Sequence, residues 1–220
     1  MKAAWNRRFF LTRASFLGVL VSGVMSVATL AMPRDEGRHE AWAADAGPAQ
    51  VLIIRHGEKP GDWSAADDET EPHLSVKGRE RAAALAVYIP ATFQAVDFLF
   101  AAKVAESSNR PVETITPLSV AIHKDIDSKF ANGEFKDLAE HILTHPKYAG
   151  KRVLICWHHG HIHDLAGALG VSNAPDKWKG HVFDQVWQID YSDGNAKLRI
   201  LNQKLLFGDS DDGVSSPKRL

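Results

Sequence analysis

Cysteine is almost absent from this sequence, which holds a single residue of that type, Cys156, among 220. One cysteine cannot form an internal disulfide. Zinc ribbons and iron–sulfur clusters need several thiolate ligands, so the sequence excludes both kinds of site. A chain without disulfides can complete its folding in a reducing compartment.

The sequence also lacks an excess of charge of either sign, with 26 Lys and Arg against 27 Asp and Glu. Surfaces that bind nucleic acid or anionic lipid usually need an excess of basic residues, so no nucleic-acid partner is predicted. With 45% hydrophobic residues, 10 Pro and 16 Gly, the composition is that of a globular protein and excludes collagen, coiled coils and wholesale disorder. The length allows one domain.

The first 43 residues have the layout of an export signal. Basic residues come first and an apolar stretch at 16–32 follows, with candidate cleavage sites after Ala31 and after Ala43. The run NRRFFLT at 6–12 resembles the twin-arginine export signal. Ordinary secretion and an uncleaved anchor stay open as alternatives, although the apolar stretch is short for a span of about 20 residues.

These features predict an exported protein, periplasmic or extracellular. Its expected partner in export is the twin-arginine machinery, and no stable membrane association is expected after the signal is cleaved. The chain then divides into a signal peptide and charged linker at 1–43, one domain at 44–207, and a polar, disordered tail at 208–220.

Within the domain, apolar runs alternate with amphipathic segments. Strands are predicted at 51–54, 96–101, 118–122 and 153–157, and a hairpin at 182–191 and 198–201. Helices are predicted at 75–89, 110–116, 135–143 and 162–169, and Pro90 is expected to end the first. This alternation predicts an α/β fold: a three-layer α/β/α sandwich whose mostly parallel sheet has an antiparallel edge hairpin at the C-terminus.

Two of the predicted parallel strands are followed by similar polar sequences. The first strand leads into Arg55-His56-Gly57-Glu58, and the fourth into His158-His159-Gly160-His161. Ligands of such sheets bind at the carboxyl ends of the strands, so both His-Gly pairs are expected in one site.

The segment VLIIRHGEKP at 51–60 resembles the signature of the histidine phosphatase superfamily, which includes phosphoglycerate mutases and acid phosphatases. Three more segments resemble motifs of that family, in the family's order: HLSVKGRERAAALA at 73–86, SSNRPVET at 107–114 and VLICWHHGHI at 153–162. The resemblance spans roughly residues 51–165 and implies a small member without a cap. It also implies that His56 is the nucleophile and that Arg55, Arg110 and His159 hold phosphate.

The same residue types suit phosphoryl transfer on chemical grounds. A neutral imidazole is a good nucleophile toward phosphorus, and His56 supplies one. The guanidiniums of Arg55 and Arg110 match phosphoryl oxygens, and His159 can donate a hydrogen bond to a further oxygen. These roles predict a phosphomonoester hydrolase that works through a phosphohistidine, needs no metal or other cofactor, and acts on a phosphorylated small molecule or a phosphoprotein.

The residue that protonates the leaving group is not assigned by the sequence. Asp127 and Glu134 are both candidates, and the enzyme could also lack a dedicated acid. The roles of His158, His161 and His163 are open too, with a packing or rim position favoured for each.

Two other functions stay open. The domain could be a non-catalytic module of the same fold that binds phosphorylated ligands. It could also be a zinc-dependent hydrolase, since His159, His161 and His163 superficially resemble the His-x-His-x-Asp-His motif of metallo-β-lactamases.

The export route gives the first testable prediction. Replacing both Arg7 and Arg8 by Lys should leave the precursor in the cytoplasm, because the twin-arginine route reads the arginine pair. Fractionation and immunoblotting of the precursor and mature forms would measure this. Normal processing of the double variant would refute the route without refuting export.

Overall fold

A mixed six-stranded sheet forms the centre of the fold in the computed structural model, which describes residues 47–61, 72–192 and 194–209. The signal peptide predicted at 1–43, and the tail from residue 210 onward, lie outside the described residues. None of the helices within the described ranges is both long and apolar enough to cross a lipid bilayer.

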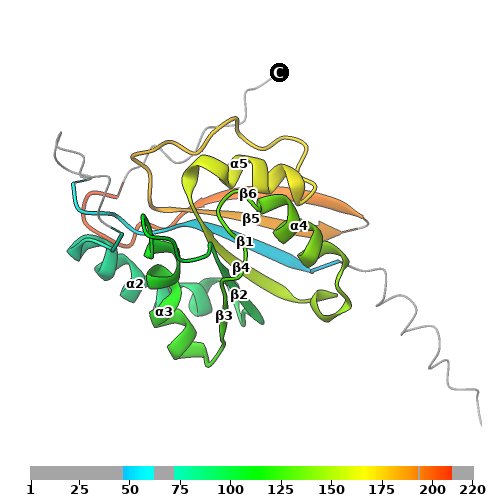
Figure 1. The fold of residues 1–220 in the computed structure, drawn as a ribbon. Helices are drawn as coiled ribbons and strands as arrows, with labels where there is room; N and C mark the ends of the chain where they lie inside the picture. Colours follow the sequence, from blue (N-terminus) through cyan, green and yellow to red (C-terminus); the bar gives the residue numbers. More distant parts are fainter. Residues whose placement is uncertain (1–46, 62–71, 193, 210–220) are drawn as a thin grey trace, which may run out of the picture. The chain divides into compact units, whose positions relative to one another are not determined.

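The elements follow one another along the chain as strands and helices in alternation (Figure 1). They are β1 (Gln50–Arg55), α2 (Val76–Phe93), β2 (Phe98–Ala101), α3 (Arg110–Ile122), β3 (Ile126–Asp127), α4 (Phe135–Thr144), a 3-10 turn (Pro146–Tyr148), β4 (Arg152–Trp157), α5 (His159–Ala168), β5 (Gln185–Ser192) and β6 (Asn195–Asn202).

The strand order in the sheet is β3-β2-β4-β1-β5-β6. Strands β3, β2, β4 and β1 run parallel, β5 pairs antiparallel with β1, and β6 completes an antiparallel hairpin with β5. The predicted mostly parallel sheet with an antiparallel edge hairpin is therefore confirmed.

Helices cover both faces of this sheet, as the three-layer prediction requires (Figure 1). Along β1, Val51 and Ile53 pack with α4 and α5, whereas Leu52 and Ile54 pack with α2 and α3. All four side chains are fully buried, because a strand between two helical layers has no face left for solvent. Burial on both faces explains why the strand appears in the sequence as an unbroken apolar run.

Two predicted helix boundaries are wrong. Helix α2 continues through Pro90 to Phe93, because Ile89 and Phe93 are buried against the sheet and hold the last turn despite the missing proline N–H. Helix α5 begins at His159 instead of Ile162, directly after β4.

The strand predicted at 118–122 is also wrong, since these residues form the end of α3. A short apolar run cannot be told from a buried helix segment by its pattern alone. In the structure Ile115 and Leu118, three residues apart on one helix face, are buried, while Val120 is exposed. The strand of this part of the chain is the two-residue β3.

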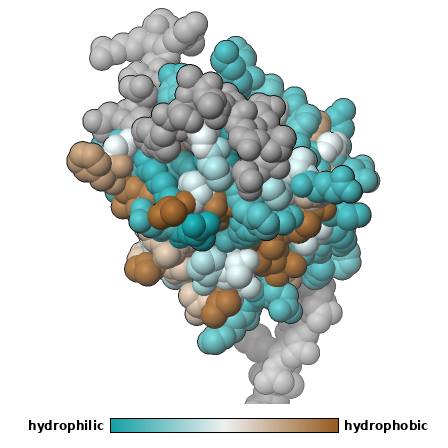
Figure 2. Space-filling model, turned by 60° about the vertical axis from the view of Figure 1, so that its left-hand side comes forward, coloured by the Kyte–Doolittle hydropathy of each residue, from teal (hydrophilic) through white to brown (hydrophobic). Residues whose placement is uncertain are grey.

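Few large hydrophobic side chains are exposed among the described residues. Figure 2 shows hydrophobic residues in separate patches on a largely hydrophilic face. The large hydrophobic side chains exposed in the described ranges are Val76, Val87, Val104, Val120 and Phe207. Scattered apolar residues of this kind are normal for a globular domain.

Helix α2 begins directly against the residues that follow β1. Ser75 caps the helix, its hydroxyl accepting a hydrogen bond from the Gly78 N–H at 3.1 Å. A Cβ atom at Gly78 would lie 2.3 Å from the carbonyl oxygen of Glu58, and one at Gly57 would lie 2.9 Å from the carbonyl oxygen of Gly78. The two backbones touch, so both positions need glycine.

Substituting Gly78 by Ala should therefore destabilise the fold although alanine favours helices. Forcing an extra carbon into a closed contact costs roughly 1–3 kcal/mol or more, which exceeds the gain of about 1 kcal/mol in helix propensity. Urea unfolding would measure the loss. The matched control is Gly167→Ala in α5, where nothing among the described residues lies within 4 Å of the new Cβ. That control should stabilise, so two variants of equal stability would contradict the prediction.

Candidate active site

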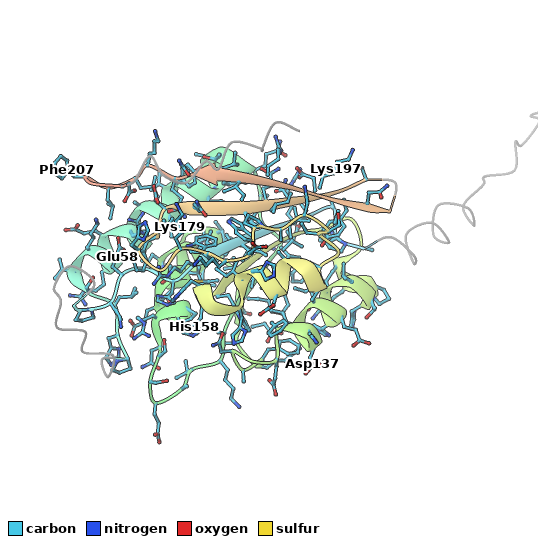
Figure 3. The ribbon with its side chains drawn as sticks, turned by 90° about the horizontal axis from the view of Figure 1, so that it is seen from above. Glu58, Asp137, His158, Lys179, Lys197 and Phe207 are labelled. Atoms are coloured by element: carbon cyan, nitrogen blue, oxygen red, sulfur yellow. The ribbon has the colours of Figure 1, made fainter. Side chains whose placement is uncertain are left out.

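The pairing of β1 with β4 brings the two His-Gly sequences together. The strands are in register from Gln50 opposite Arg152 to Arg55 opposite Trp157, and His56 N–H donates to the carbonyl of Trp157 at 3.1 Å. His56 and His158 directly follow these two strands, so they lie side by side at the same edge of the sheet. Figure 3 shows Glu58, His158 and Lys179 toward the end of the sheet where β1 and β4 finish, and Lys197 toward the other end.

A cleft of about 510 Å³ opens at this edge. All four residues that the sequence assigns to the site, Arg55, His56, Arg110 and His159, line it. The other side chains around it come from the end of β1, the segment before α3, the segment before α4 and the start of α5; they include Lys59, Lys103, Ser108, Asn132, His158 and His161.

His56 is held in one orientation and one tautomer. Its side chain is 3% exposed, and its Nδ1 lies 2.7 Å from the carbonyl oxygen of Gly57. A carbonyl only accepts, so Nδ1 carries the proton of the neutral ring. The lone pair then belongs to Nε2, which is the atom available to attack phosphorus.

The surroundings keep three imidazoles of the cleft uncharged, those of His56, His158 and His159. Burial, followed by the positive charge of Arg55, lowers the pKa of His56 well below its ordinary value. Burial and the charge of Arg110 lower the pKa of His158 to about 4. Burial and the charge of Arg55 lower the pKa of His159 to about 4 as well. Near pH 7 all three rings are neutral, which is the state a nucleophile requires.

Arg55 is fixed by the segment before β5. Its Nη1 donates to the carbonyl oxygens of Gly180 and of Val182, the latter at 3.0 Å, and its guanidinium carbon lies 3.6 Å from the centre of the Phe183 ring. Stacking on an aromatic ring and two backbone acceptors leave a planar guanidinium with little freedom. The side chain is 4% exposed, at the floor of the cleft.

Arg110 is linked through Thr114 to Gly57, the residue after His56. The Thr114 hydroxyl donates to the Arg110 carbonyl at 2.7 Å and accepts the N–H of Gly57 at 2.8 Å. One buried hydroxyl therefore connects the first turn of α3 to the residue after His56. The spacing of Arg110 and Thr114 by four residues, one helical turn, makes this link possible.

Behind His56 lies a buried ionic network. Glu58, 1% exposed, accepts from Arg81 of α2, with Nη2 and Oε1 2.7 Å apart. Arg81 also donates to Asp209 at 2.6 Å, so a residue from the tail predicted at 208–220 belongs to the folded part. These contacts raise the pKa of Arg81 above its ordinary value and lower that of Asp209. Glu58 thus supports the His56 backbone without lining the cleft.

Neither candidate acid lies in the cleft. Asp127 pairs with Lys129 at 3.2 Å, and Glu134 accepts the Ala131 N–H at 2.7 Å as part of the turn before α4. No carboxylate occurs among the described residues that line the cleft.

The proposed cluster of His159, His161 and His163 does not form. Because α5 starts at His159, side chains two residues apart point to different sides of the helix. His161 stacks on Phe135 and lies 3.4 Å from Asp164, while Nδ1 of His163 lies 2.7 Å from the Pro175 carbonyl oxygen. Among residues 47–61, 72–192 and 194–209, no three His, Cys, Asp or Glu side chains are grouped so as to hold a metal ion.

Lys103 and His158 are two of the cleft residues to which the sequence assigned no role. Lys103 follows β2 after one more residue, and β2 lies beside β4 in the sheet. The rule that ligands bind at strand ends would have pointed to it had the strand order been known. Gly160 differs from Gly57, because a Cβ at Gly160 would meet nothing within 4 Å in the described part of the chain.

Comparison with solved structures shows the fold. Mycobacterial hydrolase 1 is 14% identical with a TM-score of 0.51, and a mycobacterial glucosyl-3-phosphoglycerate phosphatase complexed with VO3 is 13% identical with a TM-score of 0.50; each match covers 70% of this chain and 98% of the other. The protein histidine phosphatase SixA complexed with tungstate is 14% identical with a TM-score of 0.48, covering 70% and 97%. No family model and no curated protein matches the sequence. The chain therefore shares its fold with a solved phosphatase.

The lowered pKa values of His158 and His159 predict a pH-dependent stability. Between about pH 6.5 and pH 4 the unfolded chain binds these protons and the folded chain does not, so the free energy of unfolding should fall as the pH falls through this range. Urea unfolding at pH 7 and pH 5 would measure the loss. A double variant with His158→Gln and His159→Gln should lose less, and the control His123→Gln, exposed and outside the cleft, should behave like wild type. Equal losses of stability in wild type, the double variant and the control would show that His158 and His159 are not the source of the pH dependence.

Proposed function

We propose that the protein is a phosphomonoester hydrolase in which His56 forms a phosphohistidine intermediate. The observation that carries the proposal is the arrangement of His56. Its Nδ1 is held by the Gly57 carbonyl, which leaves Nε2 as the nucleophile, and the ring lies at the floor of a cleft that Arg55 and Arg110 also line. The shared fold with a solved phosphatase supports the same function.

In the first step Nε2 of His56 attacks the phosphorus atom. A nitrogen–phosphorus bond forms as the bond from phosphorus to the leaving oxygen breaks on the opposite side. Arg55, Arg110 and His159 stabilise the charge on the three other phosphoryl oxygens. The leaving oxygen takes its proton from water, since no described carboxylate lines the cleft.

In the second step water attacks the phosphohistidine. The nitrogen–phosphorus bond breaks, inorganic phosphate is released, and the neutral His56 ring is restored. The net reaction consumes one water and yields an alcohol and phosphate. The guanidiniums supply the positive charge that a metal ion supplies in other phosphatases, so neither step uses a metal.

The proposed substrate is a phosphorylated small molecule or a phosphoprotein. His159 and Gly160 line both the cleft and a second hollow of about 700 Å³ between α5 and residues 176–181. The site therefore has room for a group larger than phosphate. We also propose that the protein acts outside the cytoplasm, after export by the twin-arginine route, which the N-terminal sequence supports.

The intermediate gives the decisive test. On rapid quenching into alkali with a phosphomonoester substrate, an acid-labile, base-stable phosphoryl group should be found by peptide mass spectrometry on His56. His56→Ala should abolish both the adduct and turnover, because no other ring takes its place. Turnover of wild type should persist in EDTA.

Three outcomes would contradict this mechanism. A label on His159 with turnover surviving in His56→Ala would mean that the nucleophile is misassigned. Loss of activity in EDTA that zinc restores would favour a metal-dependent hydrolase. Phosphate binding without turnover of any phosphomonoester would indicate a non-catalytic binding module.

A further inference from the structure

The segment that follows β6, residues 203–209, returns to the end of the sheet that carries the cleft. The Gln203 side chain donates to the Gln185 carbonyl at 2.8 Å, which fastens the segment to the start of β5. Figure 3 shows Phe207 of this segment and Glu58 toward the same end of the sheet. The chain end therefore lies near the residues that follow β1.

Asp209 closes this segment and is buried within it. Its Oδ2 accepts the backbone N–H groups of Leu205 at 2.8 Å and of Leu206 at 3.0 Å, and its side chain is 3% exposed. A carboxylate is costly to bury unless a cation is paired with it. That cation is Arg81 of α2, whose Nη2 lies 2.6 Å from Oδ1.

Arg81 is shared between two carboxylates from distant parts of the chain. Its Nε and Nη2 donate to the two oxygens of Glu58 at 3.0 and 2.7 Å. Its Nη1 and Nη2 donate to the two oxygens of Asp209 at 3.1 and 2.6 Å. Each edge of the planar guanidinium thus holds one carboxylate. Without Asp209, buried N–H groups of Arg81 would lose their acceptors, and the guanidinium would shift toward others and away from Glu58.

The position of Glu58 acts on His56 through one peptide group. The carbonyl that accepts from Nδ1 of His56 belongs to the planar unit that joins Gly57 to Glu58. The Cα atom of Glu58 is a corner of that plane, so a fixed Glu58 limits its rotation. The direction of the carbonyl, and with it that of the imidazole, then depends on how firmly Glu58 is held.

We propose that Asp209 is a positioning residue for His56. Through Arg81 it fixes Glu58, and the peptide group between Gly57 and Glu58 then keeps the imidazole in its attacking orientation. This inference rests on the proposed function, because it takes His56 as the nucleophile.

This role is separable from phosphate binding. Arg55 is fixed by the segment before β5, and Arg110 lies in the first turn of α3, so both guanidiniums have supports of their own. Loss of Asp209 should therefore slow transfer to Nε2 of His56 while inorganic phosphate binds as before. A misplacement of about 1 Å at the reacting atoms can cost about 100-fold in rate.

Asp209→Asn keeps the shape of the side chain and removes its charge. We expect kcat for a phosphomonoester to fall about tenfold or more, at a temperature where circular dichroism shows the variant to be folded. The dissociation constant of inorganic phosphate, measured by calorimetry, should stay within about twofold of wild type. A merely structural ion pair would lower the melting temperature and leave kcat of the folded protein unchanged.

The matched control is Asp190→Asn. Asp190 also pairs with an arginine, Arg199, at 3.1 Å, but it lies opposite Gln50 at the beginning of β1, away from the cleft. This variant should keep kcat within about twofold of wild type. Asp209→Glu retains the charge on a longer side chain, so its kcat should lie between those of wild type and Asp209→Asn.

Unchanged kcat in folded Asp209→Asn would overturn the proposal, and so would phosphate binding that weakens as much as kcat falls. If Asp209→Asn does not fold, Asp209→Glu decides, and an unchanged kcat in that variant would overturn the proposal.

Orthovanadate tests the same role without turnover. Vanadium accepts a fifth ligand and so can coordinate Nε2 of His56, whereas phosphate does not. Asp209→Asn should weaken vanadate binding about tenfold and leave phosphate binding unchanged, and equal effects on both ions, or none, would overturn the proposal. Wild type that binds vanadate but turns over no phosphomonoester would refute the proposed hydrolase alone.

Discussion

The in-register pairing of β1 with β4 is the constraint on which the site depends. Both strands are buried except at their first residues, Gln50 and Arg152, and each places alternate side chains in the two helical layers. A shift by one residue would therefore turn the apolar side chains of a strand to the wrong layers. The same register places Arg55 opposite Trp157, and it therefore places His56 beside His158 directly after the two strands. The packing of the core thereby determines which polar residues meet at the edge of the sheet. The strand register alone brings His56 and His158 together.

Around this edge, the neighbouring helices contact the segment that follows β1 and carries His56. Gly57 and Gly78 allow α2 to start in contact with the β1 end, and Thr114 links Gly57 to Arg110. The Glu58–Arg81 pair lies behind them, fully buried. Breaking such a pair by removing one partner leaves an uncompensated charge and costs roughly 3–5 kcal/mol, so the arrangement holds one geometry. Preorganised donors of this kind stabilise a transition state without reorganising during the reaction.

The features that the sequence predicted most reliably are those set by burial in the core. The strands β1 and β4 follow from runs such as 51–54 that are apolar at every position, and the residues after them follow from the rule for strand ends. The segment 118–122 was misassigned because only the tertiary contact of Leu118 decides between helix and strand. Lys103 could not be placed, because the neighbour of β2 in the sheet is not encoded locally. Whether His159, His161 and His163 could meet depended on where α5 begins. Sequence reasoning finds the start of a helix from a capping residue such as Ser or Asp, and the N-cap of α5 is His158, which gives no such signal.

The charges around the cleft bear directly on the protonation state of His56. A carboxylate beside His56 would raise the pKa of the ring and protonate the atom that must attack. The cleft instead offers Arg55, Arg110, Lys59 and Lys103, cations that lower the pKa of a nearby imidazole and attract a phosphoryl dianion. In the proposed mechanism one set of charges therefore serves two purposes: it keeps Nε2 of His56 unprotonated, and it binds the phosphoryl group that Nε2 would attack.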